Sequence, residues 1–321
     1  FLSVVCEREE QAIWAASKLA RITVWDESKE LNSKDIFVQL KNNPRQSLPV
    51  VEGVAKESPV QPFRPPENSS KTLSATYQRP YHMHGSIGPS AAIALYDAQV
   101  LKVWTHSQGI FPLRLALADV LALAEDKIHL VHVPGAGCYG HNGADDVALD
   151  AALTARAIPG RPIMLKWERA DEHAWEPFGS AMQIELQASL DDTGRVIYWN
   201  HETFSDTHMS RPSAHRENSR LLAAWHLQSP RPAPPVKPTP GFHTGIHRNA
   251  DPIYDFADRR VVKHLVHDLP LRVSALRSLG AYANVFAIES FMDELAHAIG
   301  TDPLEFRLAH LSDKRARAVL E

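Results

Sequence analysis

The chain has 321 residues, 44% of them hydrophobic, which allows a sizeable core in two domains or in one large domain with a small appendage. Its 34 basic and 38 acidic residues give a net charge of −4 without a basic stripe, which argues against nucleic acid as a partner. No apolar run approaches the roughly 20 residues of a membrane span, and Cys6 and Cys138 are too far apart for zinc or iron–sulfur spacing.

The N-terminal part predicts a strand–helix–strand pattern over residues 1–28, followed by a short helix after Ser33. Residues 41–71 are polar and proline-rich, so we expect a linker strap at a domain boundary. The chain opens without Met and closes in a segment of helical character without a C-terminal cap, Lys314–Glu321. We therefore expect a piece of a longer chain.

From Thr72 onward the pattern is mixed α/β. Hydrophobic periodicity predicts strands at 91–96, 100–104, 128–133 and 162–167, and helices at 112–124 and 144–157. Alternating apolar residues over 182–203, with Asp191–Gly194 as the turn, predict a hairpin. Residues 284–299 predict a helix that Gly300 stops, and Asp302-Pro-Leu-Glu305 begins another.

The main chemical signal is the glycine-rich segment Pro134-Gly-Ala-Gly-Cys-Tyr-Gly-His-Asn-Gly-Ala-Asp-Asp146. Gly135, Gly137 and Gly140 fit the spacing G-x-G-x-x-G between a predicted strand and a predicted helix, as in dinucleotide-binding proteins. Such glycines let main-chain N–H groups approach phosphate oxygens. The acidic residue expected about 20 positions later is missing, however. The local pattern leaves a nucleotide fingerprint and a structural glycine turn both open.

Several other residues can be interpreted either as structural residues or as site residues. The histidines at 208, 215, 243 and 247 suggest a metal cluster, but none forms the helix-borne His-Glu-x-x-His arrangement of zinc enzymes. Cys138 beside His141 could serve as a nucleophile only in an electropositive, partly open setting. Asp145 and Asp146 fit the start of a helix better than acid–base chemistry, and Glu289 fits a structural carboxylate better than a site residue.

Three further segments make the pattern specific, and their order and spacing agree across residues 72–321. They are Trp104-Thr-His-Ser-Gln108, Pro80-Tyr-His-Met-His-Gly-Ser-Ile-Gly-Pro-Ser90, and the block from Leu276-Arg-Ser-Leu-Gly280 through Asp293-Glu-Leu-Ala296 to Asp302-Pro-Leu-Glu-Phe-Arg307. Together with the glycine-rich segment they resemble the large subunits of the xanthine dehydrogenase and aldehyde oxidase family. The subgroup that they resemble contains nicotinate dehydrogenase and isoquinoline 1-oxidoreductase.

This resemblance implies a mixed α/β fold with a molybdenum-cofactor-binding domain. Residues 1–40 would be the remnant of a small α/β domain, residues 41–71 a linker strap, and residues 72–321 the first molybdopterin-binding domain, with the second one absent. Such enzymes use a molybdenum ion, held by a pterin, to hydroxylate an electron-poor carbon with water as the oxygen source. Their electrons leave through iron–sulfur clusters.

The resemblance also assigns roles to single residues. Gln108 matches the glutamine that hydrogen-bonds the oxo ligand of the metal. The loop of Gly135, Ala136, Gly137, Cys138, Tyr139 and Gly140 matches the first cofactor loop, and Arg277 and Ser278 match the second. Asn142, and with it Tyr139, falls where relatives contact the substrate. No side chain is expected to bind the metal directly.

Several positions depart from the family pattern. Cys138 and Tyr139 replace Phe and Gly, Gly88 replaces the usual Glu, and Leu279 replaces Phe. The family's catalytic glutamate, in a Gly-x-Gly-Glu context, has no counterpart here, and a general base is needed for the attack on substrate. We therefore expect the base beyond residue 321 and expect this fragment alone to be inactive.

The predicted function is hydroxylation of a small N-heteroaromatic substrate such as nicotinate. The implied cofactor is molybdenum–molybdopterin in its cytosine dinucleotide form, and the implied partners are a small [2Fe-2S] subunit and an acceptor such as a cytochrome. Two locations remain as alternatives, the bacterial cytoplasm and the periplasmic side of the inner membrane. An aldehyde-oxidising member of the family and a nucleotide-binding oxidoreductase are the alternative enzymes. A degenerate scaffold domain is the alternative outside catalysis.

Overall fold

The chain forms two compact units in a computed structural model that describes residues 2–25, 35–135 and 137–321. The first unit comprises Phe1–Asn32, Met83–Phe178 and Ser210–Pro235. The second comprises Ser33–His82, Gly179–Met209 and Val236–Glu321. Both units are therefore assembled from interleaved segments. The division at residues 40/41 and 71/72, which the resemblance implied, stays a prediction.

The first unit is built on a four-stranded mixed sheet in the order β6-β5-β4-β7. Strands β5 and β6 pair in parallel, and β4 pairs antiparallel with both β5 and β7. Its elements are α1 (Glu9–Ile22), β4 (Ala91–Asp97), β5 (Val100–Thr105), α3 (Ile110–Leu121), the 3₁₀ turn η1 (Glu125–Lys127), β6 (Ile128–His132), α4 (Ala144–Ala157), β7 (Ile163–Lys166), α5 (Arg169–Trp175) and the 3₁₀ turn η2 (Leu222–His226).

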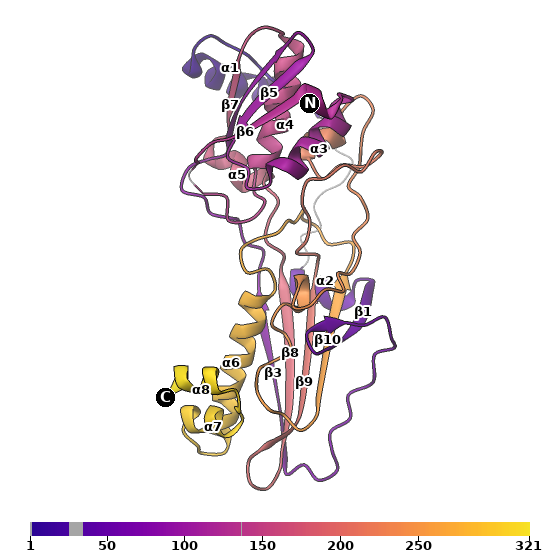
Figure 1. The fold of residues 1–321 in the computed structure, drawn as a ribbon, viewed down its shortest axis with the longest axis vertical. Helices are drawn as coiled ribbons and strands as arrows, with labels where there is room; N and C mark the ends of the chain where they lie inside the picture. The colour runs from indigo at the N-terminus through magenta and orange to yellow at the C-terminus, as the bar shows by residue number, and fades with distance from the viewer. Residues whose placement is uncertain (1, 26–34, 136) are drawn as a thin grey trace. The chain divides into compact units, whose positions relative to one another are not determined.

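Helix α4 lies against this sheet, as Figure 1 shows. Its sequence is rich in alanine, the best helix former, and Ala148, Ala151 and Ala152 are fully buried. Small side chains let the helix backbone approach the sheet closely, so Leu101 and Val103 of β5 pack in the same core. The strand ends that precede Gln108 and the glycine-rich segment are therefore supported by a well-packed layer.

The second unit is built on a six-stranded sheet in the order β2-β1-β10-β9-β8-β3, in which only β9 and β10 pair in parallel among the described strands. Its elements are α2 (Ile36–Asn42), β1 (Arg45–Val51), β2 (Val54–Ala55), β3 (Lys71–Arg79), β8 (Met182–Leu190), β9 (Val196–Ser205), the 3₁₀ turn η3 (Gly245–His247), β10 (Arg259–Val266), α6 (Ala281–Ala298), α7 (Pro303–Ala309) and α8 (Lys314–Leu320).

Helix α6 runs alongside β3 and β8 (Figure 1) and covers one face of this sheet. Its buried positions Ala287, Phe291 and Leu295 recur at intervals of four, which places them on one stripe. They meet Ile184 and Leu186, which alternate along β8. The second core therefore fixes the start of α6, which directly follows the second predicted cofactor loop.

The expected mixed α/β fold and most predicted elements are confirmed, including the helix at 144–157 and the hairpin. Three predictions were wrong. No strand forms at residues 2–6 or 23–25, because these short segments have no partner strand among the described residues. Part of the expected linker strap forms β1 and β2, because Leu48 and Val50 alternate toward a small core with Val261.

None of the described helices is both long and apolar enough to cross a lipid bilayer.

Asn284 gives a test of the second unit, because its fully buried amide joins three segments. Its amide nitrogen donates to the carbonyls of Ile246 (2.8 Å) and Arg248 (3.0 Å), and its oxygen accepts from the Thr203 hydroxyl (2.8 Å). Because Asn284→Ala leaves these groups buried without partners, we expect it to lower the free energy of unfolding by about 2–4 kcal/mol. Urea unfolding measures this. The exposed control Asn68→Ala should have almost no effect, and equal losses would contradict the structural role.

Candidate functional site

Gln108 lies between the end of β5 and the start of α3 and is exposed. Its side-chain oxygen accepts a hydrogen bond from the main-chain N–H of Gly140 at 3.2 Å. Its side-chain nitrogen donates to none of the described residues, so two N–H donors are left for a ligand. The structure therefore brings Gln108 together with the glycine-rich loop, and their contact with a cofactor stays a prediction.

The backbone conformation of this loop explains why glycine occupies positions 135, 137 and 140. A Cβ at Gly135 would lie 2.5 Å from Cβ of His106, and one at Gly137 would lie 2.6 Å from Cζ of Tyr139. Gly137 and Gly140 have φ values of 103° and 124°, which side-chain-bearing residues rarely adopt. Tyr139 itself has φ 53°, a left-handed conformation that is strained for a bulky residue. Ala136 lies outside the described residues.

Cys138 is held inside the loop by its neighbours. Its thiol donates to the carbonyl of Gly140 at 2.9 Å and lies 3.2 Å from Oδ1 of Asn142. Burial raises the pKa of this thiol, although the main-chain N–H groups of Asn142 and Gln108 act in the opposite direction. A thiol with a raised pKa is a poor nucleophile at neutral pH, so the nucleophile hypothesis gains no support.

Asn142 is fully buried, and both ends of its amide are engaged within the protein. Its nitrogen donates to the Ser86 hydroxyl at 2.8 Å, and its oxygen accepts from the N–H of Ala144 at 3.0 Å, just ahead of α4. The Asn142 side chain therefore connects the glycine-rich loop to the segment that contains Ser86 and to the start of α4. Its contact with substrate stays a prediction.

A buried polar network fixes the backbone on both sides of Gln108. The Ser107 hydroxyl donates to Oδ1 of Asp145 at 2.5 Å, and Nδ1 of His141 lies 2.8 Å from Oδ2 of the same carboxylate. Ser107 Oγ also accepts from the N–H of Gly109. The Ser107 hydroxyl donates directly to the carboxylate, whereas in a nucleophilic triad the serine donates to the histidine, so this arrangement is not that of a triad. Instead the three residues tie the Gln108 segment to the start of α4.

The start of α4 also argues against the nucleotide fingerprint. In that motif the phosphate lies at the helix N-terminus, directly after the glycines. Here the helix begins at Ala144, and its first turn contains the buried carboxylates of Asp145 and Asp146. Their hydrogen bonds to Ser107 and to the N–H of Leu222 fill that position with negative charge from the chain itself.

Two buried carboxylates, one in α5 and one directly after it, hold the segment that contains Ser86, a feature that the sequence analysis missed. Glu172 accepts from the N–H of Ser90 at 2.6 Å, and Glu176 accepts from the N–H of His84 at 2.7 Å. Burial raises the pKa of Glu172, and the neighbouring Glu176 raises it further. The i, i+4 spacing of the two residues was the available signal, but burial could not be read from it.

The second predicted cofactor loop belongs to the second unit. Arg277 and Ser278 are exposed there, at the turn that leads into α6. Ser278 and Leu279 have left-handed φ values of 71° and 53°. A Cβ at Gly280 would lie 2.3 Å from the carbonyl oxygen of Ile246, so only glycine fits at this position. The loop thus has a strained backbone beside two exposed polar side chains.

Other candidates fare differently. No group of three or more metal-ligating side chains exists in the part of the chain that the structure describes, so the histidines offer no metal centre there. Glu289 accepts from the Tyr254 hydroxyl and pairs with Arg307 at 2.9 Å, which is the structural role favoured from the sequence.

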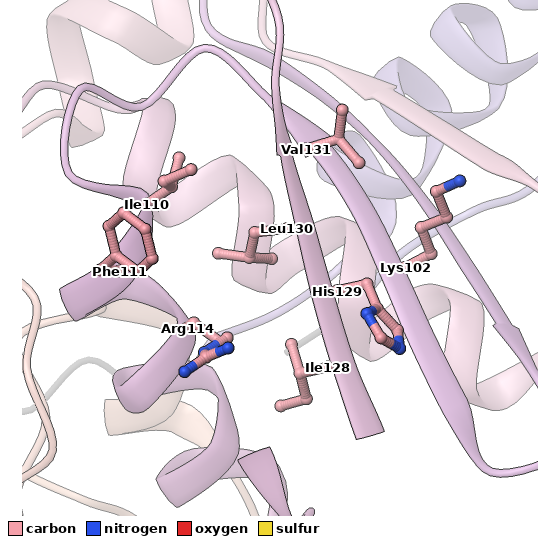
Figure 2. A pocket seen from close by; sticks show the side chains of 8 residues that line it. All are labelled: Lys102, Ile110, Phe111, Arg114, Ile128, His129, Leu130 and Val131. Carbon is pink, nitrogen blue, oxygen red and sulfur yellow. The ribbon is translucent and has the colours of Figure 1, made fainter. Parts of the chain in front are cut away.

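A pocket of about 450 Å³ lies along the edge strand β6 of the first unit. Figure 2 shows it from close by, with Phe111 and Arg114 from α3 and Leu130 from β6. Its lining consists of Lys102, Ile110, Phe111, Arg114, Ile128, His129, Leu130 and Val131. None of the predicted cofactor residues lines it, so this pocket does not identify the cofactor site.

Comparisons with known proteins identify the fold and the family. The fold is that of the cofactor-binding domains of molybdenum hydroxylases: it matches a chain of CO dehydrogenase from Oligotropha carboxidovorans with a TM-score of 0.66 and 14% identity, over 94% of this chain and 37% of that one. The model of the molybdopterin cofactor-binding domain matches residues 64–228 and 234–311. The chain belongs to this family.

Two curated relatives show where in the family it falls. The chain is 37% identical to one of the subunits of the nicotinate dehydrogenase of Pseudomonas putida, over 98% of this chain and 25% of that protein. It is 27% identical to the molybdenum-binding subunit of an aldehyde oxidoreductase of Escherichia coli, over 74% of this chain and 28% of that protein. The chain therefore spans about a quarter of the length of these relatives.

The buried carboxyl pair predicts a pH dependence of stability. Because the pKa of Glu172 is raised above its ordinary value of 4.5, the folded state holds this proton more tightly than the unfolded state does. The contribution of Glu172 to the free energy of unfolding is fully present below pH 4.5 and is lost as the pH rises through the pKa of the folded state. The variant Glu172→Gln keeps an acceptor for the N–H of Ser90 but cannot lose a proton. As the pH rises above 4.5, its melting temperature should therefore fall less than that of the wild type.

Thermal unfolding across a pH series measures the effect, with the exposed Glu57→Gln as the matched control. A parallel decline in wild type and Glu172→Gln would show that this carboxyl group does not titrate in the folded state.

Proposed function

We propose that the chain is part of a molybdenum hydroxylase that oxidises an N-heteroaromatic substrate of the nicotinate type, with water as the oxygen source. The observation that supports it most is the 37% identity, along 98% of the chain, with a protein that is named as a nicotinate dehydrogenase subunit. At the site, it is supported by Gln108, whose amide holds the glycine-rich loop with its oxygen and leaves its nitrogen for a ligand.

The residues present fit a molybdenum cofactor. The exposed amide of Gln108 has N–H donors left for it. Glycine at 135 and 137 keeps the loop beside Gln108 compact, because a Cβ there would collide with His106 or Tyr139. Gln108 and the main chain of Gly135 and Gly137–Gly140 would hold the cofactor in the first unit, and the assignment of Arg277 and Ser278 as a second cofactor loop stays a prediction. When bound, the cofactor supplies the redox centre at which a carbon of the substrate is hydroxylated.

The chain's own residues then have definable tasks. The amide nitrogen of Gln108 would donate a hydrogen bond to the cofactor, and the Ser107–Asp145–His141 network keeps the backbone beside Gln108 in place. Tyr139, 38% exposed on its strained backbone, is the side chain of the loop best able to contact a substrate ring. In this proposal Asn142 affects the substrate indirectly, because it fixes the loop that contains Tyr139.

The remaining parts of the proposal concern the whole protein. They are a cytosine dinucleotide form of the cofactor, a small [2Fe-2S] subunit that takes the electrons, and a cytochrome or another acceptor beyond it. The general base lies outside the residues of this chain. Aldehyde oxidation is the second candidate, because the chain is also similar to the aldehyde oxidoreductase of Escherichia coli.

Substitution of Gln108 tests the assignment in the full-length protein with its partner subunits. We expect Gln108→Ala to lower kcat on pyridine-3-carboxylate by about 10–100-fold, because a ligand-orienting hydrogen bond is lost. Stopped-time product assays measure turnover, and metal analysis measures molybdenum per subunit. The exposed control Gln11→Ala should keep both values. Unchanged turnover in Gln108→Ala would remove its role, and tight NAD binding without molybdenum would overturn the proposed function.

A further inference from the structure

Arg79 is a buried arginine beside the second cofactor loop. It is the last residue of β3, lies opposite Met182 of β8, and is only 4% exposed. Its Nε donates to Nδ1 of His82 at 3.3 Å, and its Nη1 donates to the carbonyl of Leu279 at 3.3 Å. Its Nη2 donates to none of the described residues. A guanidinium group with five N–H donors is therefore only partly used.

No carboxylate of the described residues forms an ion pair with Arg79, although buried charges are almost always paired. Its other close groups are neutral: the Met182 sulfur at 3.9 Å from Nη1, and the Tyr282 ring with its centroid 5.4 Å from Cζ. Burial lowers the pKa of Arg79. The charge thus lacks a partner from the part of the chain that the structure describes.

Two histidines near Arg79 are neutral and supply no negative charge to it. Burial lowers the pKa of His82 and of the fully buried His208, and the charge of Arg79 lowers both further. His208 Nε2 lies 3.0 Å from the Ser205 hydroxyl, while its Nδ1 has no hydrogen-bond partner among the described residues. Burial and, to a smaller extent, the charge of Arg79 therefore favour the neutral form of both rings.

The N-terminus of α6 adds a second positive feature. Tyr282, which stacks with Arg79, is the second residue of this 18-residue helix, and the N-cap Gly280 provides no side-chain cap. The N-terminal end of a helix has a partial positive charge, so an anion is favoured there and a cation is disfavoured. A buried cation at this end, with unused donors and no acidic partner in the described part of the chain, is what an anion-binding site requires.

We propose that Arg79 and the N-terminus of α6 form an anion-binding subsite that accepts one carboxylate or phosphate group of a ligand bound at the Arg277–Ser278 loop. The planar fork of the guanidinium matches two oxygens of either group. The carboxylate source rests on the proposed function, since it is an N-heteroaromatic acid. The phosphate source is the cofactor itself. In both cases Arg79 also holds the loop through the carbonyl of Leu279.

The subsite is tested first without any turnover, on the cofactor-free full-length protein. Thermal unfolding is followed while inorganic phosphate or pyridine-3-carboxylate replaces chloride at constant ionic strength. Stabilisation by either probe is expected in the wild type, because a ligand that binds only the folded state raises its stability. It should be lost in Arg79→Met, kept in part in Arg79→Lys, and unchanged in Arg64→Met, which removes an exposed arginine of the same unit.

The complete enzyme then distinguishes the two sources. If the group is the cofactor's phosphate, Arg79→Met lowers the molybdenum and pterin content per subunit. If it is the substrate's carboxylate, the content is kept, and KM for pyridine-3-carboxylate rises by about 10-fold or more, while KM for the uncharged pyridine-3-carboxamide is unchanged.

Two results would overturn the subsite: no stabilisation of the wild type by either probe beyond that of chloride, or full stabilisation in Arg79→Met. If Arg79→Met does not fold, the wild-type titration and Arg79→Lys still decide. If the wild-type enzyme contains no molybdenum, the proposed function fails, and the anion titration on the same protein still tests the subsite.

Discussion

The carboxylate of Asp145 is the constraint on which the candidate site in the first unit depends. A carboxylate that is 3% exposed must receive hydrogen bonds within the protein, and Asp145 receives them from Ser107 and His141. Ser107 directly precedes Gln108, and His141 directly follows the glycine-rich loop. One buried charge therefore fixes the two segments that the hydrogen bond between Gln108 and Gly140 brings together.

Both predicted cofactor loops store backbone strain. Tyr139 in the first loop and Ser278 with Leu279 in the second have left-handed conformations, which cost non-glycine residues of order 1–3 kcal/mol each. Such conformations persist only where the surroundings fix them. Cys138 and Asn142 do this for the first loop through short contacts at 2.9–3.2 Å. In the second, the tight approach of Gly280 to Ile246 and the hydrogen bond from Arg79 to Leu279 have this role.

The sequence predicted elements with strong periodicity and missed those with mixed faces. The alanine-rich helix at 144–157 and the hairpin were found because their patterns repeat over several turns or pleats. Strand β10 was missed because it places Lys263 and His264 at buried positions, which hides its apolar alternation. Gln108 and the glycines could be found through family motifs. The contacts of Asp145 with Ser107, of Glu172 with Ser90 and of Arg79 with Leu279 could not, since these partners lie far away in the sequence and depend on the tertiary fold.

The two units solve the same physical problem in different ways. Each unit has a strained loop with exposed polar groups. A buried charged residue stabilises each loop, Asp145 in the first unit and Arg79 in the second. The charge of Asp145 is compensated inside the chain, by a hydroxyl and an imidazole. Arg79 has only neutral partners among the described residues. Because the fold compensates the first buried charge and leaves the second without an acidic partner among the described residues, negative charge from a ligand would be stabilised more at Arg79 than at Asp145.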